Sequence, residues 1–188
     1  MSSAREHILQ TTCDLMEKQG YHGTGLNEIV KESGAPKGSL YHYFPEGKEQ
    51  ITSEAVMQSG KATAQRIQNG LSENSNAAKA IYDFVLNIAD HVESSGFAAG
   101  SPLTAVAMET ATKSERINLA CREAYMLLET AFKEKLLESG FTKIKADELG
   151  TFITAAIEGG IILSRTYHSG NPLRTVAKNL KVLLSQSI

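Results

Sequence analysis

Eleven residues near the N-terminus decide how this chain can fold: Gly34-Ala-Pro-Lys-Gly-Ser-Leu-Tyr-His-Tyr-Phe44. Pro36 suits the start of a helix, because the N–H that it lacks would have no helical partner there. Pro45 disfavours helical geometry in Phe44, so the helix has to end at that point. The segment therefore predicts a helix of only about two turns, Lys37 to Tyr43.

A second short helix comes directly before this segment. Thr24 stands at an N-cap position, apolar residues follow it at helical spacing, and Gly34 closes the helix. A longer helix, expected from about residue 3 to 19, precedes both and ends at Gly20 as a C′ glycine. Two short helices joined by a glycine-containing turn have the outline of a helix-turn-helix.

The rest of the chain also has helical periodicity. It contains four prolines and no tryptophan, and no run of alternating β-branched residues indicates a strand. Further helices are expected from residue 47 or 48 to 70, over 77–94, 102–112, 114–138 and 146–168, and after Pro172. The predicted fold class is all-α, with about nine helices.

Composition excludes several classes of protein. The 188 residues carry 19 Lys and Arg against 21 Asp and Glu, a net charge of −2, which excludes a histone-like protein that coats nucleic acid by bulk charge. Cys13 and Cys121 form no metal or disulfide motif and are interpreted as packed apolar residues. With no secretion signal and no membrane-spanning stretch, we expect a cytoplasmic protein without a membrane partner.

The local charge of the N-terminal region weighs against nucleic-acid binding. Residues 1–60 contain five Lys and Arg and eight Asp and Glu, a net charge of −3. The distribution of these charges favours nucleic-acid binding, because residues 33–43 carry one cation, Lys37, and no acid. A helix of that composition can approach phosphates without repulsion.

The segment 34–44 resembles the DNA-reading helix of TetR-family bacterial transcriptional regulators. The surrounding pattern matches as well, through Ile8-Leu9, Leu15, Gly20-Tyr21, Thr24, Ile29, and Phe44 followed by Lys48. Later stretches look like the regulatory half of one subgroup, the LmrA/YxaF-like repressors: Gly100-Ser-Pro-Leu-Thr-Ala-Val-Ala-Met-Glu109, Glu158-Gly-Gly and Pro172-Leu-Arg-Thr-Val. The resemblance covers nearly the whole chain.

The resemblance implies a DNA-binding domain over residues 1–47 and a ligand-binding and dimerisation domain over residues 48–188. Small residues at the start of a reading helix allow close approach to base edges, whereas lysine, tyrosine and histidine can reach phosphate. The expected DNA contacts are Thr24, Lys37, Gly38, Ser39, Tyr41, His42 and Lys48. Gly25 and Pro36 depart from the family pattern, which puts a side-chain phosphate contact and a capping hydroxyl in doubt.

Aromatic and thioether residues of the C-terminal half are candidates for an effector pocket, although most such residues simply pack in a core. They are Phe84, Phe97, Met108, Tyr125 and Phe152. No Lys/Arg cluster accompanies them, which favours an apolar, uncharged or weakly acidic aromatic ligand. The resemblance implies flavonoid-like effectors, with Thr104, Glu109 or His91 as candidate orienting groups.

The last two helices have the pattern of a partner surface, with an a/d-like apolar stripe. The candidate homodimer residues are Ile153, Gly160, Val176, Leu180 and Leu184. Ordinary core within one chain is the alternative for the same pattern.

No catalytic constellation, metal-ligand spacing or cofactor motif is present, so no catalytic residue, metal or cofactor is expected. The sequence predicts a homodimeric transcriptional repressor, not an enzyme, that binds a pseudo-palindromic double-stranded operator in the bacterial cytoplasm, at the nucleoid. A small aromatic ligand would release it. The alternative is a helical small-molecule carrier or enzyme with a vestigial DNA-binding head.

Overall fold

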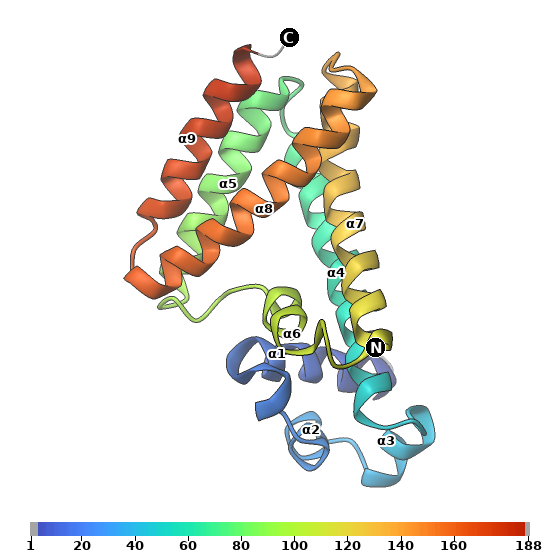
Figure 1. The fold of residues 1–188 in the computed structure, drawn as a ribbon. Coiled ribbons are helices and arrows are strands. Elements are labelled where there is room, and N and C mark those ends of the chain that lie inside the picture. The colour runs from blue at the N-terminus through green and yellow to red at the C-terminus, as the bar shows by residue number, and fades with distance from the viewer. Residues whose placement is uncertain (1–3, 187–188) are drawn as a thin grey trace. The chain divides into compact units, whose positions relative to one another are not determined.

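A computed structural model describes residues 4–186, which form nine α-helices and no strand (Figure 1). The helices are α1 (Ala4–Gly23), α2 (Leu26–Ser33), α3 (Lys37–Tyr43), α4 (Lys48–Ser72), α5 (Ala77–Ser94), α6 (Pro102–Thr110), α7 (Glu115–Glu138), α8 (Lys143–Tyr167) and α9 (Asn171–Gln186). The all-α prediction is confirmed.

Local signals place most helix ends where the sequence predicts them. Gly20 has φ 74°, which ends the regular part of α1 and leaves one further turn before Gly23. Gly34 has φ 63° and closes α2, because glycine takes the left-handed conformation without steric cost. The start of α8 lies three residues earlier than expected, since the side chain of Thr142 accepts a hydrogen bond from the N–H of Lys145 and caps the helix.

The chain divides into two compact units. The first contains the chain through Lys61 together with Ser101–Ala124, so α6 and the start of α7 belong to it. Its core is built around α1, on which α2, α3 and α6 pack. Ile8, Ile29, Leu40 and Phe44, each 0% exposed, form the centre of that core.

The second unit contains Ala62–Gly100 and the chain from Tyr125 onward. Within it α9 packs on α5 and α8, which also contact each other (Figure 1). Arg174 at the start of α9 donates hydrogen bonds to Glu93 at 2.7 and 2.8 Å and to Asp90 at 2.8 Å, both near the end of α5. These bonds fix the helix ends that the apolar contacts bring together.

In the range 4–186, none of the helices combines the length and the apolar composition needed to cross a membrane.

Candidate nucleic-acid interface

The short helix α3 is fixed on the first unit by its apolar side. Leu40 and Phe44 are fully buried, as their spacing of four residues predicts. The guanidinium of Arg5 also lies 5.4 Å from the centre of the Phe44 ring. A helix of seven residues would not be stable alone, so this anchoring is what holds its outer face in place.

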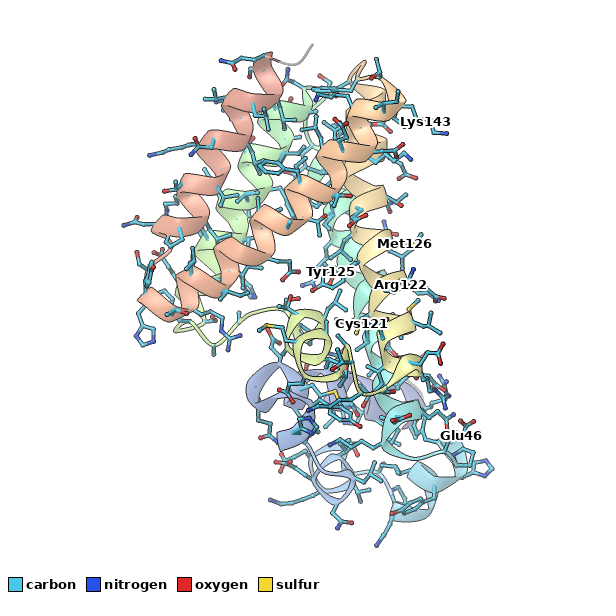
Figure 2. The ribbon with its side chains drawn as sticks, in the orientation of Figure 1. Glu46, Cys121, Arg122, Tyr125, Met126 and Lys143 are labelled. Atoms are coloured by element: carbon cyan, nitrogen blue, oxygen red, sulfur yellow. The ribbon has the colours of Figure 1, made fainter. Side chains whose placement is uncertain are left out.

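That outer face carries polar groups and no carboxylate. Lys37, Gly38, Tyr41 and His42 are exposed, and Ser39 is half-buried. The first acid after α3 is Glu46, which Figure 2 labels. It forms an ion pair with Arg116 of α7, so its charge is compensated. The surface that α3 offers is therefore a donor-rich one with a single formal cation, suited to phosphate oxygens and base edges.

The structure places Thr24 in the turn before α2 and not at the N-cap of that helix, which corrects the capping prediction. Its side chain is 0% exposed, and its hydroxyl donates to the carbonyl of Gly20 at 2.8 Å. Gly25 is the N-cap of α2 and makes no side-chain capping bond. Thr24 shapes the turn before α2, and its hydroxyl is not available to a phosphate in this conformation.

Lys48 lies at the start of α4 and already has partners within the first unit. Its ammonium donates to the carbonyl of Tyr21 at 2.6 Å and lies 4.2 Å from the centre of the Tyr21 ring. Partial burial lowers the pKa of Lys48, and the carboxylate of Glu109 opposes that shift. A phosphate contact by Lys48 would have to compete with, or share, these interactions.

Sequence reasoning missed the role of Arg116. Its guanidinium reaches Glu46 and also donates to the hydroxyl of Ser53 at 3.2 Å, which links the start of α7 to α4. Glu46 is 70 residues away in the chain, so no local pattern could reveal this pair.

The five candidate effector residues do not share one environment. Phe84 packs edge-to-face on Phe132 at 6.1 Å, and Phe97 stacks on His168 at 5.3 Å. Met108 and Phe152 are 78% and 52% exposed, so neither lines an enclosed pocket in this conformation. The helical period places such residues on one side of a helix but does not tell whether that side is covered.

A large open groove lies instead within the first unit, and none of the five candidates lines it. Its volume is about 1080 Å³. Its walls come from α1, α4 and α7 and carry both signs of charge, with Arg5, Lys61 and Arg116 beside Glu6, Glu54 and Glu123.

The candidate dimer residues lie mostly in the core of the second unit. Ile153, Leu180 and Leu184 are 0 to 2% exposed, and Gly160 is buried against Leu173 and Val176 of α9. Val176 is half-buried. In this conformation the four buried residues are covered by their own chain, which is the alternative that the sequence left open. The large apolar side chains that the described parts of α8 and α9 expose are different ones: Ile144, Phe152, Ile162, Leu163, Tyr167, Val182 and Leu183.

Neither cysteine has the character of a reactive thiol. Burial, with Asp14 and Glu17 nearby, raises the pKa of Cys13 to about 12, and burial raises the pKa of Cys121 to about 11. Cys121 lies one turn before Tyr125 on α7 (Figure 2). Among the described residues, no three histidine, cysteine or acidic side chains come together as a metal site.

Comparisons with known proteins match two parts of the chain to protein families. Residues 8–55 match the family of bacterial regulatory proteins called the tetR family. Residues 77–179 match the C-terminal domain of the LmrA/YxaF-like transcriptional regulators.

Two relatives from Bacillus subtilis (strain 168) match along almost their full length. The HTH-type transcriptional regulator YxaF, described as uncharacterized, is 44% identical over 96% of this chain and 95% of its own. The HTH-type transcriptional regulator LmrA is 39% identical over 97% of both chains. Among solved structures, the reduced form of E. coli NemR has the same fold, with a TM-score of 0.83, 22% identity, and coverage of 95% of this chain and 96% of its own.

These matches define a class of DNA-binding regulators that are not enzymes. The chain belongs to the TetR family of bacterial transcriptional regulators and, within it, has a C-terminal domain of the LmrA/YxaF-like kind.

Proposed function

We propose that this TetR-family regulator is a repressor that acts in the cytoplasm as a homodimer, with one α3 helix in each of two major grooves of a pseudo-palindromic operator. The observation that carries the proposal is the outer face of α3, which presents Lys37, Ser39, Tyr41 and His42 without a carboxylate. Half-sites one helical turn apart, about 34–36 Å, fit such a dimer.

Within this surface the residues have different roles. Lys37, Gly38 and Ser39 stand at the start of α3, where a reading helix meets base edges. Tyr41 and His42 lie one turn later and would donate to phosphate oxygens. We assign Lys48 a contact with a DNA phosphate in the bound state only. There its ammonium would either leave the carbonyl of Tyr21 or bind the carbonyl and the phosphate together.

A gel-shift titration against DNA upstream of the protein's own gene tests the proposal. Wild-type protein should form a specific complex that weakens steeply with salt. Lys37→Ala and Ser39→Ala should change which operator variants bind best, because each removes a base contact worth about 1–3 kcal/mol. Lys31→Ala is the control, since this exposed lysine of α2 pairs with Glu32.

Two outcomes would contradict it. Uniform weakening across all operator variants would reduce Lys37 and Ser39 to positioning residues. The absence of any salt-sensitive specific complex would favour the carrier or enzyme alternative.

We also propose that a small, largely apolar aromatic ligand of the flavonoid kind releases the operator. The LmrA/YxaF-like character of the C-terminal domain supports this, as do the half-buried aromatic residues Phe84, Phe97 and Tyr125 of the second unit. Release follows if the ligand binds better to the conformer whose α3 helices no longer match the two grooves.

The test is a ligand screen read out by melting temperature and by dissociation of the operator complex. Flavonoid-like aromatics should raise the melting temperature and dissociate the operator complex. Phe97→Ala and Tyr125→Ala should blunt the response while DNA binding persists, with the exposed Met126→Ala as control. Release by charged or carbohydrate ligands alone would overturn the proposal.

The partner surface we propose is the exposed apolar side of α8 and α9. Phe152, Gly159 and Leu163 repeat at intervals of seven and four residues, so they share one face of α8. A Cβ added at Gly159 would meet nothing within 4 Å in one chain, so this face is open to close approach by a second helix. Exposed apolar residues in such a contiguous set mark an interaction surface.

A further inference from the structure

The last turn of α1, which follows Gly20 and leads into α2, is held from two sides at a single peptide group. The ammonium of Lys48, on α4, donates to the carbonyl of Tyr21 at 2.6 Å. The N–H of His22 donates to the carboxylate of Glu109, on α6, at 2.8 Å. That carbonyl and that N–H belong to the same peptide, so a cation and an anion stabilise the two ends of one peptide dipole.

Gly20 lets the carboxylate come this close. A Cβ built on Gly20 would lie 2.0 Å from Oε1 of Glu109, so the carboxylate fills the space that any other side chain would need. The backbone at Gly20 also has φ 74°, which glycine adopts without strain. The missing side chain of Gly20 and its positive φ therefore both permit the contact between Glu109 of α6 and the turn.

The held peptide also determines how α2 begins. The carbonyl of Tyr21 accepts a second bond, from the N–H of Thr24 at 3.3 Å, and the hydroxyl of Thr24 donates to Gly20. Because Gly25 caps α2 without a side-chain bond, the direction in which α2 leaves α1 depends on this turn.

A further polar contact at this turn involves a side chain and not the peptide. The ammonium of Lys113 lies 3.1 Å from Nε2 of His22, on an exposed surface. Glu109 itself was a candidate for orienting an effector, but in the structure its carboxylate is taken by the backbone of the turn.

We propose that Glu109 is a positioning residue for DNA binding: its carboxylate on α6 holds the Tyr21–His22 peptide and so sets the pose in which α2 and α3 meet the operator. The inference rests on the proposed function, because it assigns a role in DNA binding to a residue that does not touch DNA. Without this hydrogen bond, a smaller fraction of molecules is in the binding-competent pose, which lowers the apparent affinity by the same factor.

Three variants separate the hydrogen bond from the charge. Glu109→Ala removes both. Glu109→Gln removes the charge but retains a side-chain oxygen that can accept the N–H of His22. Glu115→Gln is the matched control, since Glu115 is an exposed glutamate of the same unit at the start of α7.

Amide exchange resolved by NMR measures the contact directly, without DNA. In Glu109→Ala the His22 amide should exchange roughly tenfold faster, as expected for removal of one charge-assisted hydrogen bond. Glu109→Gln should retain most of the protection, and Glu115→Gln all of it. The amides of buried α1 residues report whether the fold is intact in each variant.

DNA titration over a range of salt supplies the second measurement. Glu109→Ala should raise the operator Kd roughly tenfold at every salt concentration, with an unchanged salt slope, because every phosphate contact is retained. Removal of a negative charge by itself would strengthen DNA binding. Weaker binding by Glu109→Ala therefore could not be explained by the change in charge alone. Glu109→Gln should bind close to wild type.

The inference is overturned if His22 exchange does not change in Glu109→Ala, or if it rises while operator affinity stays at the wild-type level. A Glu109→Gln variant as weak as Glu109→Ala would also overturn it, since charge and not the hydrogen bond would then be responsible. If wild-type protein formed no specific DNA complex, the proposed function would fail together with the DNA role of Glu109. The exchange measurement would still decide whether the contact exists in solution.

Discussion

Cys13 shows how burial sets the chemistry of a single residue. Its thiol donates to the carbonyl of Ala55 at 3.1 Å inside the first unit, 7% exposed. With the pKa raised to about 12, and that of Cys121 to about 11, only about one thiol in a thousand or fewer is ionised near pH 8.

We therefore expect both thiols to resist DTNB in the folded protein and to react completely once guanidinium chloride unfolds it, because the thiolate is the reacting form. Absorbance during the DTNB reaction measures this, and the unfolded sample is the control. Rapid reaction of Cys121 in the folded state would instead identify it as an accessible thiol.

At the scale of elements, Glu93 joins α5 to α9. It accepts bonds from Arg174 and from the N–H of Gly170 at 2.8 Å. The Arg174 guanidinium, with the Gly170 N–H, lowers the pKa of Glu93 to about 2, below its ordinary 4.5. A carboxylate with a lowered pKa stabilises the fold above its ordinary value, and this contribution is lost as the pH falls through its folded pKa.

Glu93→Gln should therefore lower the free energy of unfolding at neutral pH, and its difference from wild type should shrink as the pH falls from about 4.5 towards 2. Urea denaturation at a series of pH values measures this. Asp90→Asn is the matched control and should have a smaller effect, because Asp90 is 68% exposed and makes one bond to Arg174. A difference that stays constant over this pH range would show that the Glu93 charge is not what stabilises the helix junction.

At the scale of the whole molecule, one side of α8 and α9 is buried within the chain and the other side is exposed. Leu180 faces α5 and α8 in its own chain, whereas Leu163 is 44% exposed. Leu163→Glu should yield a folded monomer that no longer binds the operator, since it places a charge in the proposed dimer surface. Leu180→Glu should instead unfold the protein or cost at least about 3 kcal/mol, because it buries an unpaired charge in the core.

Sedimentation with circular dichroism distinguishes these results. Met126→Glu, at an exposed apolar position of α7, is the control and should remain dimeric (Figure 2). If Leu163→Glu also stayed dimeric, the partner surface would lie elsewhere.

Local physical chemistry made much of the fold predictable. The short helix α3 has the expected bounds, Lys37–Tyr43, because Pro36 and Pro45 act on their immediate neighbours. Leu40 and Phe44 are buried, and the residues expected to face DNA from α3 are on its outer side. The prediction that Thr24 is the N-cap of α2 was wrong, because Gly25 takes that position. Threonine is common both at N-caps and in turns where its hydroxyl bonds to a nearby carbonyl, so residue type alone could not separate the two.

The sequence by itself determined the helices, their apolar faces and the family resemblance, since these depend on spacing within a few residues. Only the tertiary structure decided what covers each face. The apolar stripe of α9 with Leu180 and Leu184 is buried against α5 and α8 of the same chain, whereas a different apolar face, on α8, is exposed. Helical periodicity reveals that a face is buried, but not by which partner. The contact between Glu109 and the turn at His22 joins residues 87 positions apart, and a pairing over that distance depends on how α1 and α6 pack.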